Sequence, residues 1–213
     1  MPSVDTLITL AKHYVGYLGK YMDQDLESFT ANPNGKYNMF ASELDSLGDF
    51  YNGKKNGYDW CDVFYDWLLY KTFGKELALK LLCQSLKSLG AGVKYSAQYY
   101  KNNNQFFSTP QVGDQIFFGN AVNDTWTHTG IVTEVTSSYV NTVEGNAQAT
   151  FNGIKYESAV AAFRYPLTWG SIIGYGRPNW NLIDQPTLTQ EQFNSMMDVW
   201  LSTHNLEIKV TEK

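Results

Sequence analysis

The sequence predicts an α+β protein in which helices come first along the chain and an antiparallel sheet follows. Apolar residues recur at helical spacing between residues 4 and 90, whereas later segments alternate at the two-residue period of strands. The runs His128–Val135 and Tyr139–Glu144 flank the turn residues Ser137-Ser138, which is typical of neighbouring antiparallel strands. Helices followed by such a sheet form an α+β layout, so we expect the N-terminal helices to pack on the sheet.

Composition limits the classes of protein that the chain can belong to. Its 213 residues, 43% of them hydrophobic, suit one domain of roughly 150–200 residues with an appendage. A net charge of −5 without a Lys/Arg cluster excludes nucleic acid as a partner. No run of 18 apolar residues occurs, so we expect no membrane insertion.

Metal and cofactor motifs are missing from the sequence. The two cysteines, Cys61 and Cys83, cannot build a multi-disulfide scaffold, and there is neither a C-x-x-C nor an H-E-x-x-H motif. We therefore predict no metal site and no cofactor.

The first half of the chain contains the expected helices. Residues 4–19 form an amphipathic helix that Gly19 ends, and a polar loop over 30–57 includes a short helical piece at Phe40–Leu47. Residues 60–72 are apolar on nearly all sides, which predicts a helix buried in the core and ended by Gly74.

A second helix is predicted from Lys75 to Leu89, with Cys83 inside it as a packing residue. Residues 95–109, rich in tyrosine and asparagine, are interpreted as a surface segment. Further strands are expected at Gln115–Phe118, 154–165 and 171–177.

The C-terminal part differs from the rest. We expect a main domain over 1–180, a linker over 181–188, and an amphipathic helix with a tail over 189–213. Thr189 to Gln192 reads as a capping box, and an apolar stripe follows at helical spacing up to residue 204. This helix either docks on the main domain or contacts a partner, which includes a second copy of the chain.

The stretch 56–64 contains the first candidate for catalysis. Asp59 is expected to be the N-cap of a helix, which makes Cys61 its second residue. A cysteine there meets free backbone N–H groups and the positive end of the helix dipole, which favour thiolate over thiol. The same N–H groups are suited to hold an oxyanion. The alternative is that Cys61 is a small core residue.

A cysteine nucleophile requires a base and a group that orients the base. His128 begins a strand, and Glu144 ends the next one, where hairpin geometry can bring the two together. Asn146 is either an alternative orienting group or a substrate contact. A buried structural imidazole is the competing interpretation of His128.

Three aromatic residues flank these positions. Tyr58, Trp60 and Trp126 are candidates to line the substrate cleft. Core packing is an equal alternative for Trp60, whereas Trp126 is expected in an exposed loop over Gly119–Thr127.

Four motifs in this order resemble the CHAP family of cysteine, histidine-dependent amidohydrolases/peptidases. They are Trp60-Cys61, the run Pro110–Phe118, His128–Val132, and Val143-Glu144-Gly145-Asn146. The resemblance covers about residues 4–179. It implies a papain-like α+β fold and cleavage of an amide bond in bacterial peptidoglycan, with Cys61 as nucleophile, His128 as base, Glu144 as orienting acid and Asn146 close by.

The resemblance also implies a biological setting. Many members are phage lysins, and the bond cut is either the muramoyl-L-alanine amide or a stem or cross-bridge peptide bond. Some phage members have an acidic calcium loop before the cysteine, but residues 52–56 here are not acidic, so calcium is not predicted. Residues Met1–Lys20 do not form a secretory signal, so we expect synthesis in the cytoplasm and access to the cell wall through a holin pore, in the virion or by another export route.

Two other functions agree with the same sequence. One is a secreted antibacterial toxin with the same chemistry. The other is an inactive module that binds the cell wall or builds the virion, against which the intact Cys61, His128 and Glu144 argue.

Overall fold

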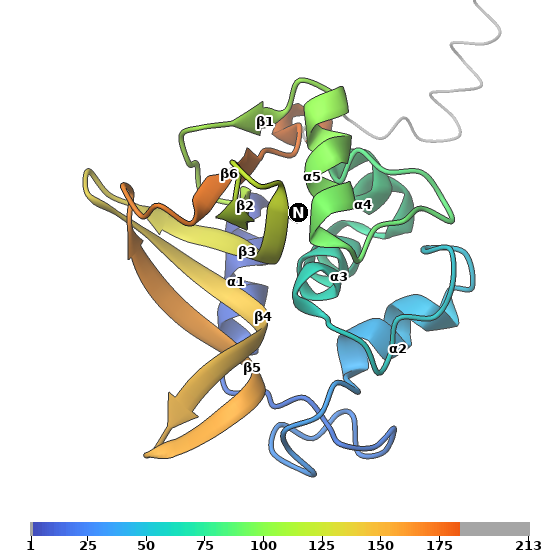
Figure 1. The fold of residues 1–213 in the computed structure, drawn as a ribbon. Coiled ribbons are helices and arrows are strands. Elements are labelled where there is room, and N and C mark those ends of the chain that lie inside the picture. The colour runs from blue at the N-terminus through green and yellow to red at the C-terminus, as the bar shows by residue number, and fades with distance from the viewer. Residues whose placement is uncertain (1, 184–213) are drawn as a thin grey trace, which may run out of the picture. The chain divides into compact units, whose positions relative to one another are not determined.

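The structure, a computed structural model, describes residues 2–183 and is an α+β fold (Figure 1). The described residues form five α-helices and a six-stranded sheet in the order β1-β6-β2-β3-β4-β5, in which every pair of neighbours is antiparallel. The α+β class predicted from the sequence is thereby confirmed. The predicted helix over 189–213 and the linker over 181–188, except its first three residues, lie outside the described residues, and the division of the chain at 180 stays a prediction.

The elements follow one another as the sequence pattern indicated, helices first and strands afterwards. The helices are α1 Val4–His13, α2 Met39–Ser46, α3 Cys61–Phe73, α4 Lys75–Leu81 and α5 Val93–Asn102. The strands are β1 Phe106–Phe107, β2 Gln115–Asn120, β3 Thr125–Val135, β4 Tyr139–Phe151, β5 Ile154–Pro166 and β6 Ile172–Gly176, followed by a short 3-10 helix, η1, at Trp180–Leu182. Among the described residues, every helix is too short or too polar to span a membrane.

Helix α3 is the centre of the main core. Nine of its residues, from Cys61 to Leu69, are buried, in agreement with the prediction of a helix apolar on nearly all sides. It packs against α1, α2 and α4 and against β3 and β4; Figure 1 shows α2 and α4 on the side of α3 that faces away from the sheet. The N-terminal end of α3 is therefore held next to the two strands that carry His128 and Glu144.

The first helix is shorter than the sequence pattern predicted. It ends at His13 instead of continuing to residue 19. The following residues run beside β5, where Gly16 N–H donates to the Val160 carbonyl and Val160 N–H donates to the Tyr17 carbonyl. Backbone groups of this segment thus bond to a strand in place of another helical turn.

The segment between α4 and β1 also differs from expectation. The predicted helix Lys75–Leu89 ends at Leu81, and Cys83 adopts a left-handed backbone with φ +56°. Residues 93–102, interpreted as part of a surface segment, form α5, which buries Ser96, Ala97 and Tyr100 on one face. The few apolar positions of α5 gave too weak a periodic signal among polar neighbours.

Both faces of β2 are buried from Gln115 to Phe118. Phe117 packs with Ala97 and Tyr100 of α5, whereas its neighbours Ile116 and Phe118 belong to a second cluster, because successive strand residues point to opposite faces. That second cluster also contains Val132, Val140 and Tyr175, with Tyr165 at its edge. His128 lies at the edge of this cluster, since its ring contacts that of Phe118.

Candidate active site

Cys61 is the first residue of α3 and is 5% exposed. The N-cap is Trp60, and no side chain caps the helix, so the prediction that Asp59 is the cap is wrong. The Asp59 carboxylate is instead engaged by Lys36, whose Nζ lies 2.6 Å from Oδ1, and by Asn146. Backbone N–H groups in the first turn of α3 therefore lack a side-chain partner and surround Cys61.

His128 projects from β3 and joins Cys61 to Glu144. Its Nε2 lies 2.9 Å from Oε2 of Glu144, and the nearby Cys61 side chain is among the groups that raise the pKa of the imidazole. Because Nε2 is engaged by Glu144, Nδ1 is the ring nitrogen left for Cys61. The structure thus brings together the three residues that the sequence proposed as nucleophile, base and orienting acid.

The charge state of His128 follows from these two partners. Burial of the ring by itself lowers its pKa, but the hydrogen bonds to Cys61 and Glu144 and their negative charges outweigh burial and raise the pKa of His128 to about 10. The imidazolium form of His128 is therefore favoured.

Glu144 is 1% exposed, and its carboxylate has three hydrogen-bond donors. His128 and the Tyr165 hydroxyl donate to Oε2, the latter over 3.3 Å, and the Thr142 hydroxyl donates to Oε1 over 2.6 Å. Sequence reasoning missed Thr142 and Tyr165. The two-residue spacing from Glu144 was an available signal for Thr142, whereas Tyr165 depends on the pairing of β4 with β5.

Asn146 has a different environment from the one expected. Its Nδ2 donates to Oδ1 of Asp59 over 2.9 Å, and its Oδ1 accepts a 2.9 Å hydrogen bond from the Ser158 hydroxyl. The Ser158 oxygen in turn accepts from the Trp60 indole N–H. Asn146 therefore ties β4 to the two residues that precede Cys61, and its φ of +53° lies at an irregularity in the pairing of β4 with β5.

The three aromatic candidates for the cleft have different surroundings. Trp60 is 0% exposed and packs in the main core, so the prediction that it contacts substrate is wrong; core packing, its stated alternative, holds. Tyr58 is 67% exposed and remains a candidate contact. Trp126 belongs to β3 and not to an exposed loop, and its half-buried ring packs against Phe106 and Phe117.

A buried carboxylate in the first turn of α3 bonds to two neighbouring elements. Asp62, which follows Cys61, is fully buried and accepts hydrogen bonds of 2.6 Å from the Ser96 hydroxyl and from Nε2 of Gln115. Burial raises the pKa of Asp62 to about 6. These bonds join α3 to α5 and β2, so the position of Cys61 is fixed by three elements.

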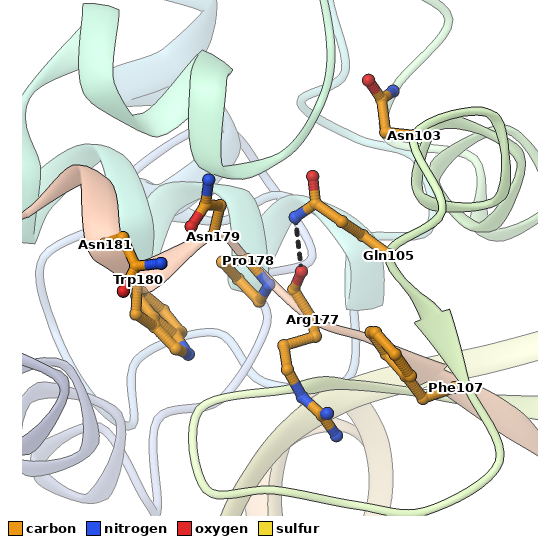
Figure 2. Close-up of a pocket in the computed structure, with 8 residues that line it drawn as sticks. All are labelled: Asn103, Gln105, Phe107, Arg177, Pro178, Asn179, Trp180 and Asn181. Carbon is orange, nitrogen blue, oxygen red and sulfur yellow. Dashed lines mark hydrogen bonds between the residues drawn. The ribbon is translucent and has the colours of Figure 1, made fainter.

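A pocket of about 440 Å³ lies elsewhere, beside β1 and the segment that follows β6 (Figure 2). Its lining consists of Asn103, Gln105, Phe107, Arg177, Pro178, Asn179, Trp180 and Asn181. Arg177 is neutralised there by Asp114, whose carboxylate accepts from Nε and from a terminal nitrogen, at 3.0 and 2.9 Å. None of these lining residues is a nucleophile or a base, so the pocket is separate from the Cys61 chemistry.

No metal centre is formed by the described residues, among which no group of three or more His, Cys, Asp or Glu side chains is arranged to hold an ion. The loop before Cys61 is organised by a protein carboxylate. Asp45 accepts hydrogen bonds from the backbone N–H groups of Lys55 and Asn56, at 2.8 and 2.9 Å.

A helix-borne cysteine beside a strand histidine, in a domain with helices before an antiparallel sheet, defines a papain-like α+β fold. Residues 53–146 match the family model of the CHAP domain. This stretch contains Cys61, His128, Glu144 and Asn146, and the match confirms the resemblance that the sequence indicated.

Two further comparisons complete these findings. A solved structure described as a wild-type endolysin, LysIME-EF1, is similar at 14% sequence identity and a TM-score of 0.42, over 97% of this chain and 88% of that chain. No curated protein matches this chain. The CHAP match supports the general class of hydrolases that act on peptidoglycan.

Proposed function

We propose that this protein is a cysteine-dependent amidase or endopeptidase that cuts an amide bond of bacterial peptidoglycan, as a phage lysin does. The observation that carries the proposal is the His128 ring, which bonds to the Glu144 carboxylate over 2.9 Å and interacts with Cys61 at the start of α3. Cys61 is the nucleophile, His128 the base and Glu144 the orienting acid.

The chemistry follows from this geometry. The Cys61 thiolate attacks the carbonyl carbon of the scissile amide, and a C–S bond forms as the carbonyl oxygen takes the negative charge. Uncapped N–H groups at the start of α3 stabilise that oxyanion, an interaction worth roughly 3–4 kcal/mol per donor in comparable enzymes. The C–N bond then breaks while the His128 imidazolium gives its proton to the leaving amine, which yields a thioester and a neutral imidazole.

Water completes the cycle. The neutral His128 imidazole accepts a proton from a water molecule, whose oxygen attacks the thioester carbonyl. The C–S bond breaks, the Cys61 thiolate is restored, and the carboxylic acid product leaves. Glu144 keeps the imidazole in one orientation and stabilises the imidazolium that forms in each half of the reaction.

The substrate class is inferred from the CHAP match, because resemblance to this family implies action on peptidoglycan. The site of action is accordingly the bacterial cell wall. Both the muramoyl-L-alanine bond and the stem or cross-bridge peptide bonds agree with the proposed chemistry, because each is an amide with an amine leaving group.

The experiment compares wild-type protein with Cys61→Ala and Cys83→Ala on purified peptidoglycan. Cys83 is the matched control, because burial raises the pKa of its thiol to about 11, which leaves it unreactive. We expect C61A to lose turbidity clearance by a factor of at least about 10³ and C83A to retain it. Clearance by C61A at the wild-type rate would refute the assignment.

Mass spectrometry of the digested peptidoglycan identifies the bond. A new free amine on L-alanine indicates amidase action, and a new amine within the stem or cross-bridge indicates endopeptidase action. Absence of any new amine in walls that wild type clears would refute amide cleavage.

A further inference from the structure

The Glu144 carboxylate is held by more than its histidine. Oε1 accepts a hydrogen bond of 2.6 Å from the Thr142 hydroxyl, and Oε2 accepts one of 3.3 Å from the Tyr165 hydroxyl in addition to the bond with His128. Each carboxylate oxygen thus has a donor other than the imidazole. A charged group that is almost wholly buried requires such donors, because transfer of an unpaired carboxylate out of water is strongly unfavourable.

The two donors come from different strands. Thr142 lies two residues before Glu144 on β4, so both side chains project from the same face of the strand. Tyr165 lies on the neighbouring β5, where it pairs with Val140. Glu144 is therefore fixed both along its own strand and from the adjacent one.

The Tyr165 ring is held by its neighbours, which fixes the hydroxyl. Its centroid lies 5.0 Å from that of Phe118 and 5.0 Å from that of Trp169. Phe118 also contacts the His128 ring, at a centroid distance of 6.1 Å. A single aromatic group thus supports both the tyrosine and the histidine that meet at Glu144.

The two hydroxyls are the hydrogen-bond donors and the Glu144 carboxylate is the acceptor. Burial, together with the nearby Glu144 charge, holds the pKa of Tyr165 far above its ordinary value, so the phenol keeps its proton. A threonine hydroxyl does not ionise in the relevant range. Both groups therefore act as donors, and Glu144 acts as the acceptor.

We propose that Thr142 and Tyr165 are positioning residues, which hold the Glu144 carboxylate so that His128 presents Nδ1 to Cys61. This role rests on the proposed function, in which His128 and Cys61 react as a pair. Neither residue contacts substrate in this arrangement, and both act through Glu144.

The variants Thr142→Val and Tyr165→Phe remove one hydroxyl each with little change in volume. Hydrogen bonds to a charged group are stronger than those between neutral groups, so we expect each variant to lower kcat by about tenfold or more and to leave KM unchanged. Thr142→Ser retains the donor and is expected to stay within about threefold of wild type. Tyr139→Phe on β4 is the matched control, because Tyr139 is exposed and contacts Arg164 instead of Glu144.

A double-mutant cycle separates positioning from general structural support. The rate of Cys61 alkylation by iodoacetamide is measured at pH 6, where a thiol without an imidazolium partner is almost wholly protonated. We expect Y165F and T142V to slow alkylation about tenfold in the wild-type background and less than twofold in the Glu144→Gln background. Equal slowing in both backgrounds, or no slowing in either, would overturn the proposal.

Two controls make each outcome decisive. Thermal unfolding of every variant excludes loss of the fold, and Y165F decides the question if the more deeply buried T142V does not fold. Alkylation requires no peptidoglycan, so this inference and the proposed function fail separately. If wild type clears no walls but the alkylation rates show the expected coupling to Glu144, only the peptidoglycan substrate is refuted. If wild type clears walls but the alkylation rates show no such coupling, only the positioning role is refuted.

Discussion

Asn146 donates a 2.9 Å hydrogen bond to Asp59, and so joins the Glu144 strand, β4, to the residue two positions before Cys61. Asp59 is also paired with Lys36, whose hydrogen bond and charge hold the pKa of this carboxylate below its ordinary value. The nucleophile and the acid are thus linked through the backbone of β4 as well as through His128.

We expect Asn146→Ala to lower kcat about tenfold and to lower the free energy of unfolding by about 1–3 kcal/mol. The variant loses the bonds to Asp59 and Ser158 and places alanine at a φ of +53°. Asn146→Gly is the matched control, since glycine tolerates this backbone and is expected to recover about 1 kcal/mol of stability but no activity. Urea unfolding and wall clearance measure the two effects, and full activity in both variants would contradict this role.

Ionisation of His128 makes the stability of the folded state fall as pH rises into the alkaline range. Its pKa rises from 6.5 to about 10 on folding, so the folded state binds the proton more tightly than the unfolded state. The stabilisation is fully present below about pH 6.5 and is lost as pH rises through about 10. We expect the difference in unfolding free energy between wild type and His128→Ala to shrink between pH 7 and pH 10. A difference that is constant over this interval would rule out the shift.

Asp62 changes stability in the same direction as His128, but in the acid range. Its pKa rises from 3.8 to about 6, so its ionisation lowers stability as pH rises from about 4 to 6. We expect Asp62→Asn to raise the free energy of unfolding by about 1–3 kcal/mol at pH 7 and by much less at pH 4. The amide can still accept from Gln115, and the Ser96 hydroxyl can turn to accept from it. Urea unfolding at the two pH values tests this, and an equal change at both would contradict it.

Gly130 lies so close to the Glu144 side chain that no Cβ fits between them. A Cβ at this position would lie 2.4 Å from Cγ of Glu144 and 2.9 Å from the Val143 carbonyl oxygen. We expect Gly130→Ala to displace Glu144 and to lower kcat by about tenfold or more. Gly53→Ala is the matched control, because a Cβ there meets no atom within 4 Å. Equal kcat values for the two variants would show that Glu144 tolerates the displacement.

Trp60 supports the site through the core. Its indole N–H donates to Ser158 over 2.9 Å, and its ring packs on Phe40 and Tyr17. We expect Trp60→Phe to lower the free energy of unfolding by about 1–3 kcal/mol and to leave KM unchanged. Urea unfolding and steady-state kinetics separate the two effects. A raised KM at unchanged stability would restore Trp60 as a substrate contact.

The sequence pattern was sufficient to predict an element where one periodicity or one motif dominated the segment. The buried helix predicted over 60–72, the strands of His128 and Glu144, and the order of helices before sheet all follow from spacing along the chain, although the structure moves the start of that helix to Cys61. The segment of α5 was not recognised, because Ser96, Ala97 and Tyr100 are too few to outweigh its polar residues. The length of α4 was overestimated, because the left-handed backbone that follows the helix is at Cys83 and not at a glycine, the residue that usually indicates a helix end.

The sequence by itself determined the α+β class, the CHAP motifs and the three residues proposed for the chemistry. Only the tertiary structure decided what surrounds them: Asp59 bonds to Asn146 in place of capping α3, Trp60 packs inside, and Thr142 and Tyr165 meet at Glu144. The reason is that periodicity reports contacts within one helix or strand. The register of β4 on β5 and the packing of α3 on the sheet depend on residues far apart in the chain.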